Sequence, residues 1–283
     1  MKLISDFFLT VFRGIGQIML QENPITGVFF LVGLFYGSVY YGFAALVSVI
    51  CGTITAYIFR FDKQTITTGF YGFSAALVGV ALLVFLKNNA FTWFFIVVGS
   101  MLATIVQHFF FIKKIGVFTL PFVLVTWVIC YGTTAFFPNQ LALSSIYNET
   151  KIDYFTFAFK GYGQVIFQDK LLSGILFFIG VLVNNWRVAI LGLLASVISA
   201  IISLFFYGNV LDFNMGLLGY NAVLCAIALS TAQKNYLFWI FISILIAIFF
   251  SYLFHQIHFI ALTFPFVIST MVVLKFKNKE SII

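Results

Sequence analysis

Charged residues are scarce in this chain: only 8% of its 283 residues are Asp, Glu, Lys or Arg, and its mean hydropathy is +1.12. A soluble domain is normally about a quarter charged. So few charges cannot cover an aqueous surface, which means that lipid must be the solvent. Apolar runs of about 20 residues, the length that crosses a hydrocarbon core roughly 30 Å thick, recur throughout the chain. We therefore predict an all-α polytopic membrane protein.

Cysteine is also scarce, and Cys51, Cys130 and Cys225 stand alone in apolar segments. They lack the spacing of metal ligands, and such cysteines are typically small buried side chains. The net charge of +7 comes from basic residues that stand singly or in pairs at the ends of apolar runs, without a basic stripe. This placement is typical of membrane topology signals. We expect no metal ion and no nucleic-acid partner.

Sequence motifs of several enzyme classes are missing as well. The chain contains no Walker motif, no HExxH and no GxSxG. No cluster of Asp or Glu occupies a span, as an ion- or proton-coupled carrier commonly needs. We therefore predict a protein that is not an enzyme, needs no cofactor and does not couple transport to ions. An intramembrane enzyme or an assembly scaffold is the alternative from a different class.

What the chain does contain is an internal repeat. GQIMLQENPITG begins at residue 16 and GQVIFQDKLLSG at residue 163, an offset of 147 residues, and both carry Gln at their second and sixth positions. Two further pairs follow in the same order: GFYGFSAALVGVAL with GLLGYNAVLCAIAL at an offset of 147, and TLPFVLVTW with TFPFVISTM at 144. Three paired blocks in one order indicate a duplication.

Breaks at Gly, Asn, Pro and charge divide each half into one short segment and five apolar runs. The short segments carry more polarity than a lipid-facing helix tolerates, so we predict re-entrant half-helices. We place the first repeat at 1–138, a polar linker at 139–152 and the second repeat at 153–283, together one transmembrane domain. The short segments are 4–22 and 155–169, and the runs are 24–38, 40–59, 66–86, 90–111, 115–137, 171–185, 188–207, 211–231, 235–254 and 257–275.

The positive residues give an orientation for these spans. With both termini cytoplasmic and five crossings in each half, eleven basic residues fall inside and four outside, the direction that topology rules expect. Because five is odd, the second half enters from the opposite face, which predicts two inverted-topology repeats. The inside set is Lys2, Arg13, Arg60, Lys63, Lys113, Lys114, Arg187, Lys234, Lys275, Lys277 and Lys279; the outside set is Lys87, Lys151, Lys160 and Lys170.

Polar residues that recur in both halves are the candidate site, because inverted repeats usually place a shared site near the midplane. Gln17 and Gln164 offer amide donors and acceptors. Thr119 and Thr263 stand two residues before a proline, which removes an N–H and frees an upstream carbonyl. Each has a simpler reading: a membrane Thr often bonds its own i−4 carbonyl, and a membrane Gln often ties two helices together.

Three motifs together resemble the urea transporter family: Q-x5-NPxTG from Gln17 to Gly27, YGFxxALVG from Tyr71 to Gly79 and TLPFVLxTW from Thr119. The second-half sequences LLGYNAVLCAIAL and LTFPF match its second repeat, and the resemblance covers nearly the whole chain. It implies a homotrimer with one channel per protomer, formed between two inverted repeats. Urea would pass down its gradient through a slot with apolar walls and a line of hydrogen-bonding oxygens.

The resemblance also implies roles for single residues. Gln17 and Gln164 would bind urea at two terminal sites, and Thr119 and Thr263 would line the central constriction. The expected partners are urea, membrane lipid and two further copies of the chain, in a bacterial inner membrane. The remaining expected pore-lining residues are Leu20, Val165, Phe73, Tyr220, Leu77 and Leu224.

Alternatives remain open at the level of sequence. A channel for another small neutral solute, such as ammonia or a short-chain amide, fits the same composition. His255 and His258 flank a short loop, and a histidine pair would suit ammonium conduction if it lay at mid-depth. The two halves also differ, because Lys170 stands where the first half has Asn23, and the Asn-Pro pair is missing from the second half.

Overall fold

The structure, a computed structural model, describes residues 2–116, 118–142, 151–230 and 235–280. The chain divides into two compact units, Met1–Ile146 and Tyr147–Ile283. Of the predicted linker 139–152, residues 143–150 lie outside the described part. The first unit contains α1 (Lys2–Gly16), η1 (Gln17–Met19), α2 (Pro24–Gly37), α3 (Val39–Ile58), α4 (Lys63–Thr67), α5 (Phe73–Phe85), α6 (Ala90–Ile112), α7 (Leu120–Phe136) and η2 (Pro138–Gln140).

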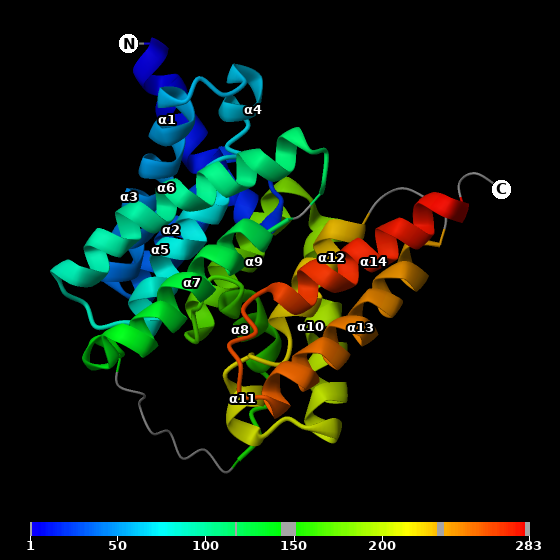
Figure 1. The fold of residues 1–283 in the computed structure, drawn as a ribbon. Coiled ribbons are helices and arrows are strands. Elements are labelled where there is room, and N and C mark those ends of the chain that lie inside the picture. Colours follow the sequence, from blue (N-terminus) through cyan, green and yellow to red (C-terminus); the bar gives the residue numbers. More distant parts are fainter. Residues whose placement is uncertain (1, 117, 143–150, 231–234, 281–283) are drawn as a thin grey trace. The chain divides into compact units, whose positions relative to one another are not determined.

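The second unit repeats the main helices of the first. Its elements are α8 (Phe157–Gln164), α9 (Leu171–Asn184), α10 (Trp186–Phe206), α11 (Val210–Asn214), α12 (Tyr220–Leu229), α13 (Tyr236–Gln256) and α14 (Phe264–Glu280), as labelled in Figure 1. In order, α8 to α14 match α1 to α7. The duplication seen in the sequence thus extends to the order of the helices.

Within the described residues, four helices are long and apolar enough to cross a membrane: α3, α6, α10 and α13, with 20, 23, 21 and 21 residues. At 1.5 Å per residue, about 20 residues cover the hydrocarbon core. Five shorter apolar helices, α5, α7, α9, α12 and α14, accompany them. The prediction of an all-α, multi-pass membrane protein is confirmed.

The predicted short segment 4–22 forms α1 and η1, which meet α2 at a bend of 76°. Asn23 caps α2, accepting a hydrogen bond from the Ile25 amide at 2.8 Å, and Pro24 is the first helical residue, where its missing N–H costs nothing. The bend folds α2 back onto α1. A Cβ on Gly27 would lie 1.9 Å from the Phe12 carbonyl oxygen, and one on Gly174 would lie 2.0 Å from that of Phe159. Both units therefore need glycine at this crossing.

Two predicted runs, 66–86 and 211–231, are not continuous helices. Each is divided into a five-residue helix, a turn and a buried helix: α4 and α5 in the first unit, α11 and α12 in the second. The turns contain Gly69 and Gly216, whose φ angles of +81° and +79° favour glycine. The sequence predicts a single run in each case because hydropathy indicates which residues are buried but not whether a helix is continuous.

Helices α5 and α12 occupy the core of their units. α5 packs against α3, α6 and α7, and α12 packs against α10, α13 and α14 (Figure 1). Every residue from Phe73 to Leu83 is buried, and so are eight of the ten residues of α12, all except Tyr220 and Ala228. Small side chains along both helices allow neighbouring helices to approach closely. The residues predicted to line a pore on α5 and α12 thus lie at the centre of each unit.

Candidate functional site

Gln17 and Gln164 are held in the same way in the two units. The Nε2 amide of Gln17, in η1, donates to the carbonyl oxygen of Thr68 at 3.2 Å. The Nε2 amide of Gln164, the last residue of α8, donates to the carbonyl oxygen of Met215 at 3.0 Å. Thr68 and Met215 are matching positions, each directly before the glycine with positive φ. The repeat is therefore reproduced in side-chain contacts.

This contact orients both amides. A glutamine amide carries two N–H donors and a carbonyl oxygen with two lone pairs. In the described part of the chain, the bond to Thr68 or Met215 is the sole hydrogen bond of each side chain, and it uses a donor. The Oε1 acceptor stays available for a ligand that donates N–H groups. Gln164 is buried, with 8% of its surface exposed, and Gln17 is half-buried.

Gln21 and Gln168, the other regular glutamines of the repeat, have a structural role. The Gln21 amide donates to the Met19 carbonyl at 2.7 Å, and the Gln168 amide donates to the carbonyls of Ile166 and Phe167 at 3.1 and 3.0 Å. Both side chains are buried. They close the turn after α1 and after α8, in which Leu20 and Phe167 adopt left-handed φ angles of 57° and 58°.

Phe167 is a candidate that the sequence analysis did not name. It is the position that matches Leu20 in the other unit, at the offset of 147 residues and with the same backbone conformation. Val165, the residue that was predicted alongside Leu20, matches Ile18 instead, and both are only 1% exposed. The signal was present in the sequence, because Leu20 and Phe167 are the fifth residues of the two aligned segments; the structure adds that they share a left-handed conformation.

Three predicted site residues of the first unit lie around one cavity. Gln17, Leu20 and Phe73 line a space of about 750 Å³ between η1, the start of α5, the end of α6 and the segment that follows α6. Its wall is mainly apolar and aromatic, with two amides and one ammonium group. The other lining residues are Phe70, Gln107, Phe111, Ile112, Lys114, Ile115, Gly116 and Phe118.

Thr119 and Thr263 follow directly on a strained residue. Phe118 and Leu262 both have a φ of 47°, an uncommon left-handed conformation for side chains of this size. This turn brings the chain into α7 and α14, and leaves Thr119 and Thr263 buried at 2% exposure each. The backbone amides of Val123 and Val267 donate to the threonine carbonyls at 3.1 Å in both units. The two threonines thus share burial and local geometry.

Tyr220 has a role in the second unit that Phe73 cannot have in the first. Its hydroxyl donates to the Leu262 carbonyl at 2.5 Å, and the Asn221 side chain accepts from the Phe266 amide at 3.3 Å. The first bond holds the strained residue before Thr263, and the second satisfies an amide in the first turn of α14. In the first unit, Ser74, at the position of Asn221, donates instead to the Gln107 side chain at 3.0 Å.

Leu77 and Leu224 lie one helical turn beyond Phe73 and Tyr220, and are 0% and 1% exposed. In an α-helix, residues four apart share a face. The predicted residues of α5 and α12 therefore form a matching pair on the same face of each helix. Tyr71, the first residue of the YGFxxALVG motif, lies elsewhere: its hydroxyl pairs with Nδ1 of His108 at 2.8 Å.

Comparison with known proteins agrees with this arrangement. The family profile described as "Urea transporter" matches residues 8–278. Urea transporter 1 of Mus musculus is 26% identical over 247 residues, covering 80% of this chain and 63% of that protein. Urea transporter 1 of Rattus norvegicus is 27% identical over 243 residues, with the same coverage. Urea transporter 1 of Ovis aries is 28% identical over 236 residues, covering 77% and 62%.

The chain spans about 63% of the length of the first two of these relatives, and the match to the family profile extends over most of its own length. The resemblance seen in the three sequence motifs is thus confirmed over both units. The chain is a member of the urea transporter family.

Proposed function

We propose that this protein conducts urea passively and in both directions across a membrane. The single observation that carries the proposal is the matched fixation of Gln17 and Gln164, each with its amide donor on a backbone carbonyl and its acceptor available. Urea is planar and neutral and carries four N–H donors. A hydrogen-bond acceptor beside apolar walls suits such a solute. Urea loses its hydrogen bonds to water when it enters, and the protein must replace each of them.

The apolar walls of this proposed path explain how it would exclude ions. Leu20, Phe73 and Phe118 surround Gln17 in the first unit with side chains that offer no charge. An ion entering such a space would lose far more hydration energy than urea does. Because these side chains offer no charge that would hold an ion, we propose that urea passes without coupling to an ion. The proposed activity is therefore transport alone, without catalysis.

The two units are proposed to be inverted-topology repeats that contribute to one path. Family membership, the matched helix order and the eleven-to-four distribution of basic residues support this arrangement. In it, Gln17 and Gln164 serve the two ends, and Thr119 and Thr263 serve the middle. The assembly is proposed to be a homotrimer with one pore per protomer, in the inner membrane, with both termini cytoplasmic.

Stopped-flow light scattering of proteoliposomes tests the function. Vesicles with purified protein are mixed with an inward gradient of urea, acetamide or an ammonium salt, and re-swelling is recorded against protein-free vesicles. We expect fast re-swelling in urea and slower re-swelling in acetamide, with ammonia unchanged from empty vesicles. Equal acceleration for all three solutes would contradict urea selectivity and favour a general channel for small neutral solutes.

A further inference from the structure

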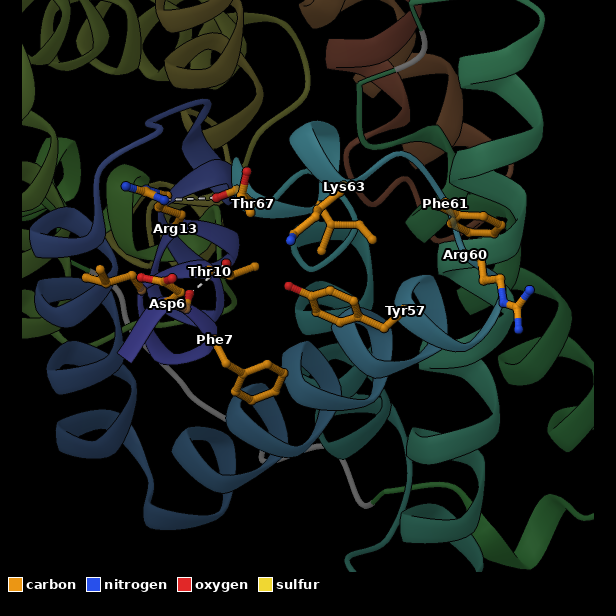
Figure 2. A pocket seen from close by; sticks show the side chains of 11 residues that line it. Asp6, Phe7, Thr10, Arg13, Tyr57, Arg60, Phe61, Lys63 and Thr67 are labelled. Atoms are coloured by element: carbon orange, nitrogen blue, oxygen red, sulfur yellow. Dashed lines mark hydrogen bonds between the residues drawn. The ribbon is translucent and has the colours of Figure 1, made fainter. Parts of the chain in front are cut away.

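A second cavity in the first unit lies away from the candidate site. It occupies about 750 Å³ between α1, the end of α3 and α4, and none of its lining residues lines the cavity around Gln17. Figure 2 shows its side chains, with the hydroxyl of Tyr57 and the ammonium of Lys63 pointing toward α1. The lining residues are Asp6, Phe7, Leu9, Thr10, Arg13, Tyr57, Arg60, Phe61, Lys63, Ile66 and Thr67.

The charge around this cavity is unbalanced. Arg13, Arg60 and Lys63 contribute three positive charges, and Asp6 contributes one negative charge. None of the three cations forms an ion pair within the described part of the chain. Asp62, next to Lys63, is turned to its own helix, where it accepts hydrogen bonds from the amide and hydroxyl of Thr65, both at 2.7 Å.

The Arg13 guanidinium has more N–H donors than its hydrogen bond to the described residues uses. One guanidinium nitrogen donates to the Thr67 carbonyl at 3.0 Å, which ties α1 to α4 (Figure 2). A guanidinium carries five N–H donors and is a preferred partner of phosphate. The apolar side of the cavity, formed by Phe7, Leu9 and Ile66, is suited to hydrocarbon rather than to water.

In the second unit, aromatic side chains occupy positions that match residues lining this cavity. At the offset of 147 residues, Thr10 and Ile66 match Phe157 and Phe213, whose rings stack at 4.3 Å in a buried cluster. Tyr207 matches Arg60 and packs against that cluster. The same fold thus encloses an apolar core in one unit and leaves a basic cavity in the other.

We propose that this cavity binds the phosphate of an anionic phospholipid, whose acyl chains lie against its apolar side. All three cations belong to the set predicted on the cytoplasmic side, where anionic headgroups attract basic residues. Basic pockets between helices on this side of a membrane are suited to phosphorylated headgroups. The occupant is a lipid because charge and apolar surface meet in one cavity. The inference does not depend on urea conduction.

Native mass spectrometry of the full-length protein tests this site. The protein in mild detergent is mixed with dioleoyl phosphatidylglycerol or dioleoyl phosphatidylcholine at equal concentration, and the lipid retained is measured. Each basic residue near a membrane surface contributes about fivefold in affinity, so R60Q/K63Q should weaken phosphatidylglycerol binding about 25-fold. Phosphatidylcholine retention should not change.

The control is K113Q/K275Q, which removes two cations from the same predicted side but outside the cavity. It should bind phosphatidylglycerol like the wild type.

Thr10→Phe, which copies Phe157, should abolish the preference for phosphatidylglycerol without changing the charge, provided that its melting temperature is unchanged. If this variant does not fold, R60Q/K63Q decides. Equal loss in both double variants, or displacement of the lipid by inorganic phosphate at equal concentration, would overturn the proposal.

Discussion

At the scale of single residues, the glutamines of the repeat separate into two pairs with different tasks. Gln17 and Gln164 use one donor on a backbone carbonyl of the next segment and keep an acceptor available. Gln21 and Gln168 bond to carbonyls one or two residues away and close their own turns. The sequence pattern treats all four alike. Only the contacts distinguish the candidate ligands from the structural residues.

Replacing each glutamine of the first unit should separate these tasks. Gln17→Leu removes the free acceptor, and we expect urea flux per folded protein to fall about threefold, because losing a hydrogen bond of about 1 kcal/mol raises the resistance of one of two sites in series about fivefold. Gln21→Leu leaves the Met19 carbonyl without its side-chain partner and should mainly lower thermal stability, by about 1–3 kcal/mol. Flux and melting temperature are measured on both variants. The reverse order of effects would assign the ligand role to Gln21.

Thr119, the N-cap residue of α7, and Thr126, within that helix, can be compared by the same substitution. Thr119→Val removes a hydroxyl at the proposed constriction, and urea flux should fall severalfold. Thr126→Val is the control, because the Thr126 hydroxyl is buried without a hydrogen-bond partner in the described residues. Removing such a group should stabilise the protein by about 1 kcal/mol and leave flux unchanged. Wild-type flux in the Thr119 variant would argue against a lining role.

At the scale of elements, the turns before α5 and α12 determine where the candidate residues lie. Each turn combines a short helix, a glycine with positive φ and the carbonyl that binds Gln17 or Gln164. A continuous helix over 66–86 would remove both the turn and that carbonyl contact. The break is therefore part of the candidate site.

Gly69→Ala should be strongly destabilising. Its φ is +81°, and an added Cβ would lie 2.3 Å from the Gly14 backbone nitrogen, so α1 would have to shift. We expect a loss of several kcal/mol, at the upper end of single substitutions. Gly132→Ala is the control: nothing lies within 4 Å of its added Cβ, and the helix should gain up to about 1 kcal/mol. Thermal melting in detergent measures both.

The cap of α4 should respond to acid. Hydrogen bonds from Thr65 lower the pKa of Asp62 below its ordinary value of 3.8. Because the pKa is lower in the folded state, the stabilisation is full above 3.8 and is lost as the pH falls through the lower folded value. Hydrogen-exchange protection of the Ile66 amide should therefore decrease on acidification below that range. Asp62→Ala should show low protection already at pH 6; wild-type protection would contradict the assignment.

Much of this architecture could be predicted from the sequence. The runs 24–38, 40–59 and 90–111 match α2, α3 and α6 within two residues, because long apolar segments bounded by Asn, Ser or Pro define helices well. The turns at Gly69 and Gly216 were missed, since the flanking residues are as apolar as a helix core. Phe167 could have been found from the sequence, because it aligns with Leu20 at the offset of 147 residues within the first pair of repeated segments.

At the scale of the whole molecule, the two units share a plan but differ in detail. Asn23 caps α2, whereas Lys170 makes no capping hydrogen bond at α9. Ser74 pairs with Gln107 in one unit, and Asn221 bonds to the backbone in the other. The duplication therefore preserved the positions of the glutamines while their surroundings diverged. We expect the two proposed terminal sites to differ in affinity for urea.

The central claim is that both units serve one path, and the urea flux of Gln17→Leu, Gln164→Leu and the double variant tests it most directly. For two sites in series, resistances add. If each lost hydrogen bond of about 1 kcal/mol raises the resistance of its site about fivefold, each single variant should lose about threefold in flux and the double variant about fivefold. Two independent paths would instead leave more than half of the wild-type flux in each single variant. That result would contradict a shared path.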